Sequence, residues 1–471
     1  MSEKELPAGW VRARLDEIAE VRLGRQRSPK NHSGDQMRPY LRAANVGWDG
    51  LKIGDVKEMN FTDDEVAIYR LAKGDIVLGE ASGSASEVGK PAIWNDEIED
   101  CCFQNTLIRV RSHLVNPKYL LHYLRYEALS GAFVEGSRGV GIHHLGAAKL
   151  SSWPMRIPPL AEQHRIVEAL EGHLSRLDAA VATVRNSRKR LAILRKTALL
   201  DLVPEEAPDS WTASTVEQAG TVELGRARHP DWHHGPEMHP YLRVANVFED
   251  RIDTSDVMEM DFSGIFEKYR LHPGDVLLNE GQSPHLVGRP ALYRGMPPDV
   301  AFTNSLLRFK ANSDVMPEWA LMVFRRHLHA RRFMREVRIT TNIAHLSSKR
   351  LKVIEFPIPP LDVQKQLVMR CDELLSGIDV MDREAARTLT RADNLRRAVL
   401  NRAFTGALVA QDPTDEPATA LLARIQADRD AQPKAKRARR TPAAPRKAKT
   451  PAPAPDPTPA PTHAVQQEFD L

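Results

Sequence analysis

The chain has 471 residues, 42% of them hydrophobic and 27% charged, which is typical of a globular protein long enough for several domains. No apolar run reaches the ~18 residues that cross a bilayer, and the start of the chain lacks the apolar region of a signal peptide, so we expect a cytoplasmic protein without membrane contact. The net charge is +4, but eight Lys and Arg residues without an acid lie between Lys434 and Lys449, which leaves −4 for the remainder. Any DNA binding by this remainder must therefore use local patches or a partner that adds positive charge.

Residues 1–158 and 205–359, which we call the first and second heads, are two copies of one unit. The pattern Tyr-Leu-Arg-x-Ala-Asn-Val at 40–46 returns at 241–247, an offset of 201 residues. Further matching blocks are Gly9-Trp10 with Ser210-Trp211, Leu23–Arg25 with Leu224–Arg226, Asp55–Phe61 with Asp256–Phe262, Gly74–Leu78 with Gly274–Leu278, Gly89–Ala92 with Gly288–Ala291, and Ile157–Leu160 with Ile358–Leu361. Gly-Asp turns that lead into short apolar strands predict mixed α/β heads.

The offset slips by one or two residues between some of the matching blocks, and there the sequences differ. Segments of this kind are expected to be loops, which tolerate changes in length and often carry function. A shared frame with different loops indicates two similar heads that bind different things.

A long helix is predicted after each head, at 159–204 and 360–410, because residues 161–203 and 362–410 are free of proline and repeat apolar residues at three- and four-residue spacing. The predicted seam residues are Ile166, Leu170, Leu177, Ala180, Val184, Leu191, Leu194 and Ala198, and then Leu367, Cys371, Leu374, Ile378, Met381, Ala385, Ala392, Leu395 and Val399. This heptad pattern favours an antiparallel coiled coil, about 60 Å long, with the heads at opposite ends. The alternative is that each helix lies on its own head.

The last part of the chain changes character. Residues 411–432 are expected to form a short helix or a linker. Residues 433–471 are rich in Pro, Ala, Lys and Arg and are expected to be disordered. The basic run is either a solubilising tail or an arm that binds DNA without sequence preference.

One motif points to DNA methylation but is not repeated. Residues 116–119, Asn-Pro-Lys-Tyr, resemble the loop with which amino-methyltransferases hold a flipped base. The second copy, Met-Pro-Glu-Trp at 316–319, keeps the proline and the aromatic residue but loses the Asn. A proline at the start of a helix explains both copies.

Other patterns with possible chemistry also fail in one copy or lack partners. The glycine-rich run 136–141 has no counterpart at 336–341 and no Gly-Lys-Ser/Thr sequence. The three cysteines have no Cys-x-x-Cys spacing, and the pairs His143-His144 and His233-His234 lack ligand spacing on a helix, so we expect no metal site and buried, apolar cysteines. The acids that could suggest a nuclease are better interpreted as turn and strand residues: Asp75, Glu80, Asp275 and Glu280. We therefore expect no catalytic residue and no cofactor.

The order of these segments resembles a known family. Each head ends in Ile-Pro-Pro-Leu, with Gln163 or Gln364 three residues beyond the Leu, and the second long helix ends in Ala-Phe-x-Gly-x-Leu at 403–408. Over residues 5–430 the chain resembles the specificity subunit of type I restriction-modification enzymes, which act in phage defence.

The resemblance implies an α+β fold in which two target recognition domains, related by a pseudo-twofold axis, are held apart by two long helices. It implies that each head binds one half of a split target in double-stranded DNA. It further implies that the chain docks two methyltransferase subunits, and through them restriction and translocase subunits, which carry the catalysis.

Residues that contact bases are expected in the segments that differ between the heads, because Arg, Lys, Asn and Gln distinguish base edges in the major groove. For the first head they are Arg25, Arg27, Lys30, Ser82, Ser84, Lys90, Arg138 and His143. For the second head they are Arg226, Arg228, Gln282, Ser283, His285, Arg289, Arg338, Thr341 and Asn342.

A second set is identical in both heads. Arg42 and Arg243 are interpreted as framework or phosphate-binding residues, and Asn45 and Asn246 as residues that hold a turn.

Two other functions remain open from the sequence. The chain could be a two-headed adaptor that binds proteins and not DNA, or a DNA-processing enzyme with an unrecognised motif. DNA methylation at a split sequence in cells that hold the chain and its methyltransferase would favour recognition over the adaptor.

Overall fold

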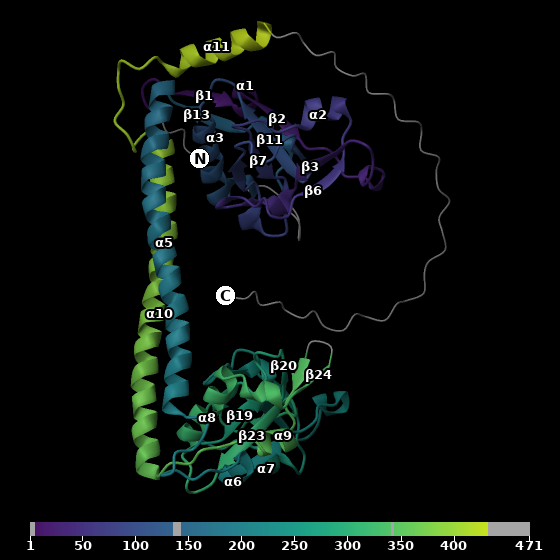
Figure 1. Cartoon of the computed structure of the whole chain (residues 1–471), viewed down its shortest axis with the longest axis vertical. Helices are drawn as coiled ribbons and strands as arrows, with labels where there is room; N and C mark the ends of the chain where they lie inside the picture. Colours follow the sequence, from purple (N-terminus) through teal and green to yellow (C-terminus); the bar gives the residue numbers. More distant parts are fainter. Residues whose placement is uncertain (1–4, 135–142, 341–342, 432–471) are drawn as a thin grey trace, which may run out of the picture.

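The computed structural model describes residues 5–134, 143–340 and 343–431. Two long helices, α5 (Leu160–Leu202) and α10 (Leu361–Phe404), form a rod, and the two heads project from its ends on the same side (Figure 1). None of the helices in the described ranges is long and apolar enough to cross a membrane. The predicted basic tail lies outside these ranges.

The first head is built on two small sheets. The larger has the order β2 (Ala19–Leu23), β11 (Leu107–Ser112), β7 (Ile76–Gly79) and β9 (Pro91–Ile93), all antiparallel neighbours. The smaller has the order β10 (Cys102–Phe103), β3 (Met37–Leu41) and β6 (Lys57–Asn60), with β10 and β3 parallel.

The second head repeats both sheets in the same order. The larger is β14 (Gly220–Leu224), β23 (Leu306–Ala311), β19 (Val276–Asn279) and β21 (Pro290–Leu292). The smaller is β22 (Ala301–Phe302), β15 (Met238–Leu242) and β18 (Met258–Asp261), again with one parallel pair. The sequence duplication is therefore a duplication of topology.

Shorter elements complete each head. In the first head they are β1 (Val11–Arg14), α1 (Leu15–Ile18), β4 (Val46–Gly47), β5 (Gly50–Leu51), α2 (Asp63–Tyr69), β8 (Ala81–Ser82), α3 (Pro117–Leu129), β12 (His143–His144), α4 (Ala147–Ser151) and β13 (Pro154–Ile157). In the second they are α6 (Val216–Ala219), β16 (Val247–Phe248), β17 (Arg251–Ile252), α7 (Phe266–Tyr269), β20 (Gly281–Gln282), α8 (Pro317–His329), β24 (Arg338–Thr340), β25 (Ile343–His345) and α9 (Ser348–Lys352).

The Gly-Asp turns begin the central strands, as predicted. Gly74 and Gly274 adopt φ values of 92° and 100°, which favour glycine. The carboxylate of Asp75 accepts a hydrogen bond from the Ala72 amide at 2.8 Å, and Asp275 accepts one from the His272 amide at 2.9 Å. These two acids are therefore turn residues.

A proline starts the equivalent helices α3 and α8, which confirms the interpretation of residues 116–119 as a helix start. Asn116 is the N-cap of α3, where its side-chain oxygen accepts hydrogen bonds from the Lys118 and Tyr119 amides. Met316 occupies the same place before α8 without such a bond.

The glutamine after each Pro-Pro-Leu junction fastens a long helix to its head. Gln163 donates to the Pro158 carbonyl at 3.0 Å and accepts from the Asn116 amide at 2.9 Å. Gln364 donates to the Pro359 carbonyl and accepts from the Met316 amide, both at 2.8 Å. Both side chains are fully buried, so this motif is part of the framework.

Ion pairs between α5 and α10 show that the helices run antiparallel, as predicted. Arg188 binds both carboxylate oxygens of Asp382, at 2.7 and 3.1 Å. On either side of this pair, Arg195 contacts Asp379 and Arg396 contacts Asp178. The pairs fix the register of the two helices.

The apolar seam serves two purposes along its length. At the ends, residues of both helices enter the core of a head, namely Ile166, Leu170, Leu400 and Phe404 in the first head and Leu199, Cys371 and Ile378 in the second. Between the heads the helices contact each other around a cavity of about 220 Å³ lined by Leu177, Val184 and Ala392. The two sequence-based alternatives for the helices therefore both apply, in different segments.

The seam prediction was wrong for Leu194, Leu374 and Met381, which are about half exposed. Leu395 is equally exposed but lines the cavity between the two helices. Each helix is covered only along a narrow stripe, so apolar residues beside that stripe stay in contact with solvent.

The predicted short C-terminal helix is α11 (Ala418–Ala431), which packs on the first head. Leu421 and Ile425 are buried in the core of that head. Arg165 of α5 binds Asp415 at 2.6 Å just before α11, and Arg429 donates to the Asp16 carbonyl at 2.9 Å. The C-terminal segment thus closes the first head.

Candidate nucleic-acid interface

The segments in which we predicted DNA contacts lie far apart in the sequence, but their roots meet at one turn of the first head. The Thr106 hydroxyl accepts a hydrogen bond from the Ala43 amide at 3.0 Å, and its carbonyl accepts one from the Glu80 amide at 2.9 Å. The neighbouring Asn105 amide donates to the Arg25 carbonyl at 2.9 Å. One turn therefore connects the loop after Arg25, the turn after Arg42 and the root of strand β8.

The second head repeats this junction bond for bond. The Ser305 hydroxyl accepts from the Val244 amide at 3.1 Å, its carbonyl accepts from the Glu280 amide at 2.9 Å, and the Asn304 amide donates to the Arg226 carbonyl at 2.9 Å. We call Asn105-Thr106 and Asn304-Ser305 the hub of each head.

Sequence reasoning missed the hub, although the signal was present. The stretch Asn-Thr-Leu-Ile-Arg at 105–109 returns as Asn-Ser-Leu-Leu-Arg at 304–308. Both versions keep the side-chain hydroxyl that the second segment needs, because Thr and Ser share it. The repeat comparison could have found these residues.

A small β-hairpin rises from each hub and carries part of the predicted contacts. In the first head β8 pairs with β12, and Ser82 lies opposite His143. The Ser82 hydroxyl accepts from the Ser84 amide at 3.1 Å, Ser84 is exposed, and Lys90 is paired with Glu87. In the second head β20, β25 and β24 form three strands, on the side of that head that faces the first (Figure 1).

The loop at 281–289 carries the other predicted contacts of the second head. Gln282 lies opposite Ala344 and its side-chain oxygen accepts from the Ser283 amide at 3.0 Å. His285 is exposed, whereas the Arg289 guanidinium lies 4.7 Å from the centre of the Phe248 ring.

A histidine and a glutamate hold the base of each hairpin. His144 lies 3.2 Å from Glu80, and His345 lies 3.2 Å from Glu280. Backbone hydrogen bonds join the same segments, because the Leu145 and Leu346 amides donate to the carbonyls of Glu80 and Glu280 at 2.8 Å. These acids are thus strand-end residues that position a hairpin.

Arg25 and Arg226 are largely buried and hold the fold together. Arg25 binds Glu65 at 2.7 Å, donates to the Asn60 carbonyl and lies over the Phe61 ring. Arg226 donates to the Asp261 carbonyl and lies 4.0 Å from the centre of the Trp232 ring. To reach a base, either guanidinium would have to leave these contacts.

Arg27, Lys30 and Arg228 differ from them because they are exposed on the loops that follow. Arg27 lines a cleft of about 400 Å³ whose other walls are His32, Tyr40, Arg42, Lys57 and Glu58. In the second head Arg228 lies over the Tyr241 ring, at 5.7 Å from its centre. Both arginine side chains are therefore accessible from solvent.

The prediction that Asn45 and Asn246 hold a turn is confirmed. Asn45 donates to the Lys52 and Asp55 carbonyls at 2.8 and 3.0 Å, and Asn246 donates to the Asp253 and Asp256 carbonyls at 3.0 and 2.9 Å. The turn places Arg42 2.6 Å from Asp55. A hydrogen bond from Lys57, together with the charges of Lys57 and Arg42, lowers the pKa of Asp55.

Some predicted contacts cannot be placed. Arg138, Thr341 and Asn342 lie outside the described residues, and Arg338 belongs to β24 but its side chain lies outside the description. The segments that carry most of the described contacts share the hub of their head, and the contacts with DNA remain a prediction.

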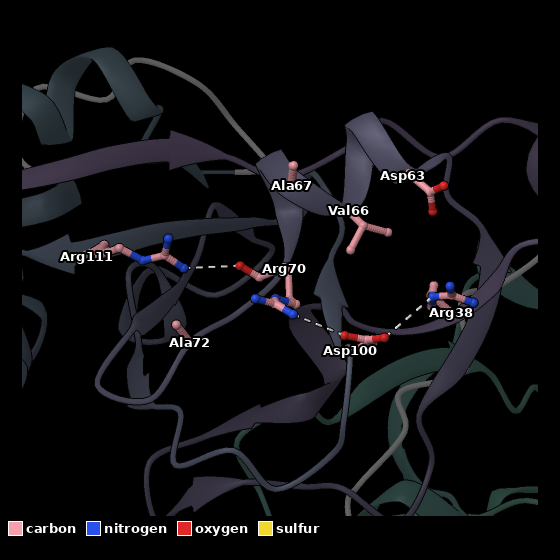
Figure 2. A pocket seen from close by; sticks show the side chains of 8 residues that line it. All are labelled: Arg38, Asp63, Val66, Ala67, Arg70, Ala72, Asp100 and Arg111. Atoms are coloured by element: carbon pink, nitrogen blue, oxygen red, sulfur yellow. Dashed lines mark hydrogen bonds and ion pairs between the residues drawn. The ribbon is translucent and has the colours of Figure 1, made fainter. Parts of the chain in front are cut away.

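A second polar cleft of the first head, of about 410 Å³, is lined by Arg38, Asp63, Arg70, Asp100 and Arg111 (Figure 2). Asp100 lies between Arg70, at 3.3 Å, and Arg38, at 3.9 Å. In the second head the ring of Phe266 stacks on His239 at 3.5 Å where Val66 and Arg38 lie in the first.

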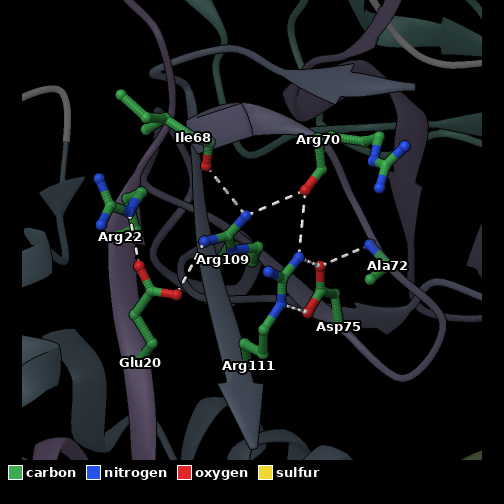
Figure 3. A network of polar contacts seen from close by, with 8 residues as sticks. All are labelled: Glu20, Arg22, Ile68, Arg70, Ala72, Asp75, Arg109 and Arg111. Atoms are coloured by element: carbon green, nitrogen blue, oxygen red, sulfur yellow. Dashed lines mark hydrogen bonds and ion pairs between the residues drawn. The ribbon is translucent and has the colours of Figure 1, made fainter. Parts of the chain in front are cut away.

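A buried arginine network stabilises the larger sheet of the first head (Figure 3). Arg109, almost fully buried, binds Glu20 at 3.0 Å and donates to the Ile68 and Arg70 carbonyls. Arg111 binds both oxygens of Asp75 at 2.7 Å. Burial raises the pKa of Glu20, but hydrogen bonding to Arg22 and the charge of Arg109 outweigh it and lower the pKa overall.

Metal or thiol chemistry would need clustered ligands or an ionised cysteine in the described part of the chain. No group of three or more His, Cys, Asp and Glu side chains there is arranged to hold a metal ion. Cys101, Cys102 and Cys371 are buried, as expected. Burial raises the pKa of Cys101 and Cys102 to about 12, so their thiols stay protonated.

Comparison with known proteins gives a consistent result. Residues 7–185 match the family described as type I restriction modification DNA specificity domain. The chain is 25% identical to the type I restriction enzyme EcoKI specificity subunit of Escherichia coli K12, over 92% of this chain and 98% of that protein. It is 24% identical to the StySPI specificity subunit of Salmonella potsdam, over 91% and 97%.

Two solved structures share the fold. A chain from a study of complex assembly and conformational transition of the type I R-M system has a TM-score of 0.67 and 19% identity, over 86% of this chain and all of that one. The HsdS subunit from Thermoanaerobacter tengcongensis has a TM-score of 0.51 and 19% identity, over 86% and 99%.

Proposed function

We propose that this chain, which belongs to the family of type I restriction-modification specificity subunits, is a non-catalytic subunit that binds a bipartite DNA target through its two heads. The observation that carries the proposal is that one sheet topology occurs twice, at opposite ends of an antiparallel rod, with different loops on the same hub. Two equivalent frames with different contact residues are what a split, asymmetric target requires.

The rod sets the distance between the two half-sites. Helix α5 has 43 residues, so at 1.5 Å per residue it is roughly 65 Å long. With ~34 Å for each turn of DNA, the centres of the half-sites lie between one and two turns apart. The bases between them form a spacer of fixed length that is not recognised.

The rod also offers a surface for the partners that carry the catalysis. Exposed apolar side chains lie along it between and beside the heads: Ile193, Leu194, Met369, Val380, Met381 and Leu395. Near the second head, an apolar groove of about 510 Å³ is lined by Leu191, Ile378 and Leu389 and bordered by Arg188 and Arg195. Exposed apolar surface of this extent on a helix favours burial against a partner.

We assign this surface to two methyltransferase subunits, one for each half of the pseudo-twofold rod, with restriction and translocase subunits bound through them. The partners also complete the charge balance, because the described chain without its basic tail is not globally positive. Such a complex acts in the cytoplasm, where it protects the cell against phage.

The proposal is tested by mapping the methylated sites in the genome of cells that express the chain. The chain is expressed with candidate methyltransferase subunits from its own source in a host without other methylation, and methylated sites are read by single-molecule sequencing. We expect one split motif with a fixed spacer. Methylation without this chain, or no split motif with it, would contradict the proposal and favour the protein-binding adaptor.

Two variants make the same experiment sharper. Replacing residues 1–158 with the equivalent head of a related chain should change one half of the motif and leave the other. Inserting four residues between Val184 and Leu191, together with four at the facing position of α10, should lengthen the spacer and leave both halves unchanged.

A further inference from the structure

The cleft beside Arg27 in the first head is rich in positive charge and open to solvent. Arg27, Arg42 and Lys57 line it, with His32 and Tyr40, and the acidic group on its wall is Glu58. Asp55 lies at its border, 2.6 Å from Arg42 and 2.9 Å from Lys57. Among the described residues Arg27 has no ion-pair partner, so its charge is available to a ligand.

The second head carries similar side chains at the equivalent positions. Arg228, Arg243, Tyr241 and Glu259 take the places of Arg27, Arg42, Tyr40 and Glu58. Arg243 binds Asp256 as Arg42 binds Asp55. A single position differs in charge, because Met258 stands where the first head has Lys57.

The framework holds both arginines in place. Asn45 and Asn246 fix the turns that carry Arg42 and Arg243. The amide of the residue after each arginine donates a hydrogen bond to the hub hydroxyl. The Nε–H groups of Arg42 and Arg243 are buried and find no acceptor among the described residues. An arginine held rigidly beside an anionic ligand loses little entropy when the ligand binds.

The position of the cleft suits a duplex that spans both heads. Strands β3 and β6, which bear Tyr40 and Lys57, lie on the side of the first head away from the rod (Figure 1). The hub connects this face directly to the root of the hairpin. A DNA segment on the hairpin would therefore pass over the cleft, and the pseudo-twofold axis repeats the contact at the other end.

We propose that this cleft and the equivalent surface of the second head bind the phosphodiester backbone of DNA, and that Arg27 with Arg42 and Arg228 with Arg243 are its anchors. From the sequence we expected Arg27 and Arg228 to contact bases. Because they are identical in both heads, and phosphates are the same at both half-sites, a phosphate contact suits them better. The anchors thus position the hairpins without contributing to sequence preference. This inference rests on the proposed function, whose heads it takes to be DNA-binding.

The experiment measures DNA affinity against salt. The full chain, assembled with its methyltransferase subunits, is titrated onto a fluorescent duplex that bears the methylated motif and onto one in which the motif bases are changed. Each phosphate contact contributes roughly 0.9 to the slope of log K against log salt. We expect Arg27→Ala and Arg228→Ala each to reduce the slope by about 1, and the double variant by about 2.

Matched variants separate a local contact from a general change in charge. Lys73→Ala removes one exposed charge of the same head outside the cleft and should leave the slope almost unchanged. Met258→Lys gives the second head the charge that the first has in Lys57 and should raise the slope by up to ~0.9. Arg42→Lys and Arg243→Lys keep the charge and should keep the slope.

The possible outcomes are distinct. Equal losses of affinity on both duplexes support the anchors. An unchanged slope in the double variant, or a loss confined to the motif duplex, would overturn them. If the unaltered complex shows no preference for the motif duplex, the proposed function itself fails, whatever the variants do.

Discussion

In the first head the guanidinium of Arg109 binds Glu20, and the neighbouring carboxylate of Asp75 is held by a second arginine, Arg111. In the second head the equivalent Arg308 binds Glu223 at 2.6 Å and also lies 3.6 Å from Asp275, while Lys310 contacts Glu223. Both arginines donate to the carbonyls that end a short helix. In both heads a buried arginine therefore binds the end of a short helix, but the acidic partners are distributed differently.

This difference shows which parts of the duplicated unit are constrained. A buried cation is needed at this position because two carbonyls and an acid point toward it. The acid, in contrast, occupies position 20 in one head and the equivalent of position 22 in the other. The bonds of the hub are the same in both heads, and the junction glutamines share two bonds, to which Gln364 adds one to the Asp314 carbonyl. The loops that rise from the hub differ between the heads. The heads are thus alike in their framework and differ in the loops that we propose to contact DNA.

The largest effect is expected from Arg308→Met. It would leave Asp275, which is buried, without its cation, and burial already raises the pKa of that carboxyl. Removing one partner of a buried pair costs about 3–5 kcal/mol, so strands β19 and β23 should lose most of their protection in hydrogen exchange.

Arg109→Met in the first head is the comparison. Asp75 keeps both bonds to Arg111 there, and the loss should be smaller by about 1–2 kcal/mol. Equal losses in the two heads would show that the second arginine of the first head does not compensate.

The junction glutamines should give nearly equal effects in the two heads. Gln364→Ala leaves the Pro359 and Asp314 carbonyls and the Met316 amide without their bonds. The expected cost is about 2–3 kcal/mol, seen as a lower unfolding midpoint in denaturant and faster exchange where α10 begins. Gln163→Ala should match it within about 1 kcal/mol.

The exposed Gln366→Ala is the control for this pair and should change the midpoint little. If Gln364→Ala lowered the unfolding midpoint no more than Gln366→Ala, the junction glutamine would not stabilise the contact between α10 and the second head.

The sequence predicted the frame well because the frame is repeated, and repetition separates constrained residues from free ones. It predicted the DNA contacts less well. In the sequence Arg25 and Arg226 belong to a polar loop. Only the fold shows that Arg25 is paired with Glu65 and that Arg226 lies over the Trp232 ring. Likewise the heptad pattern could not show which stripe of α5 and α10 is covered, so Leu194 and Met381 were assigned to the seam although about half of each side chain is exposed. Patterns along a chain record periodicity, whereas burial depends on what the rest of the chain brings to that place.

His122→Met should stabilise the first head. Both ring nitrogens of His122 are buried without a hydrogen-bond partner among the described residues, and the second head has Met322 at the same position of the helix. The gain at neutral pH is expected to be about 1 kcal/mol.

The gain should grow in acid. Burial, with the charge of Arg125, lowers the pKa of His122 to about 4, below the value of about 6.5 in an unfolded chain. The unfolded state therefore takes up the proton first, and the stability of the head falls between pH 6.5 and 4. Denaturant titrations across this range should show the difference, with the exposed His173→Met as control. A constant difference at all pH values would mean that His122 is not kept neutral by burial.

The smallest effect tests the interchange of acids directly. Glu20→Thr gives the first head the residue that the second has at this position, and it should cost about 1 kcal/mol because Glu20 is partly exposed. Adding Arg22→Glu places a carboxylate opposite Arg109, as Glu223 lies opposite Arg308, and should restore most of the loss. Hydrogen exchange of β11 in the two variants measures this. If the double variant is no more stable than Glu20→Thr alone, the position of the acid is fixed by the rest of each head, and the two charge patterns are not alternatives on one frame.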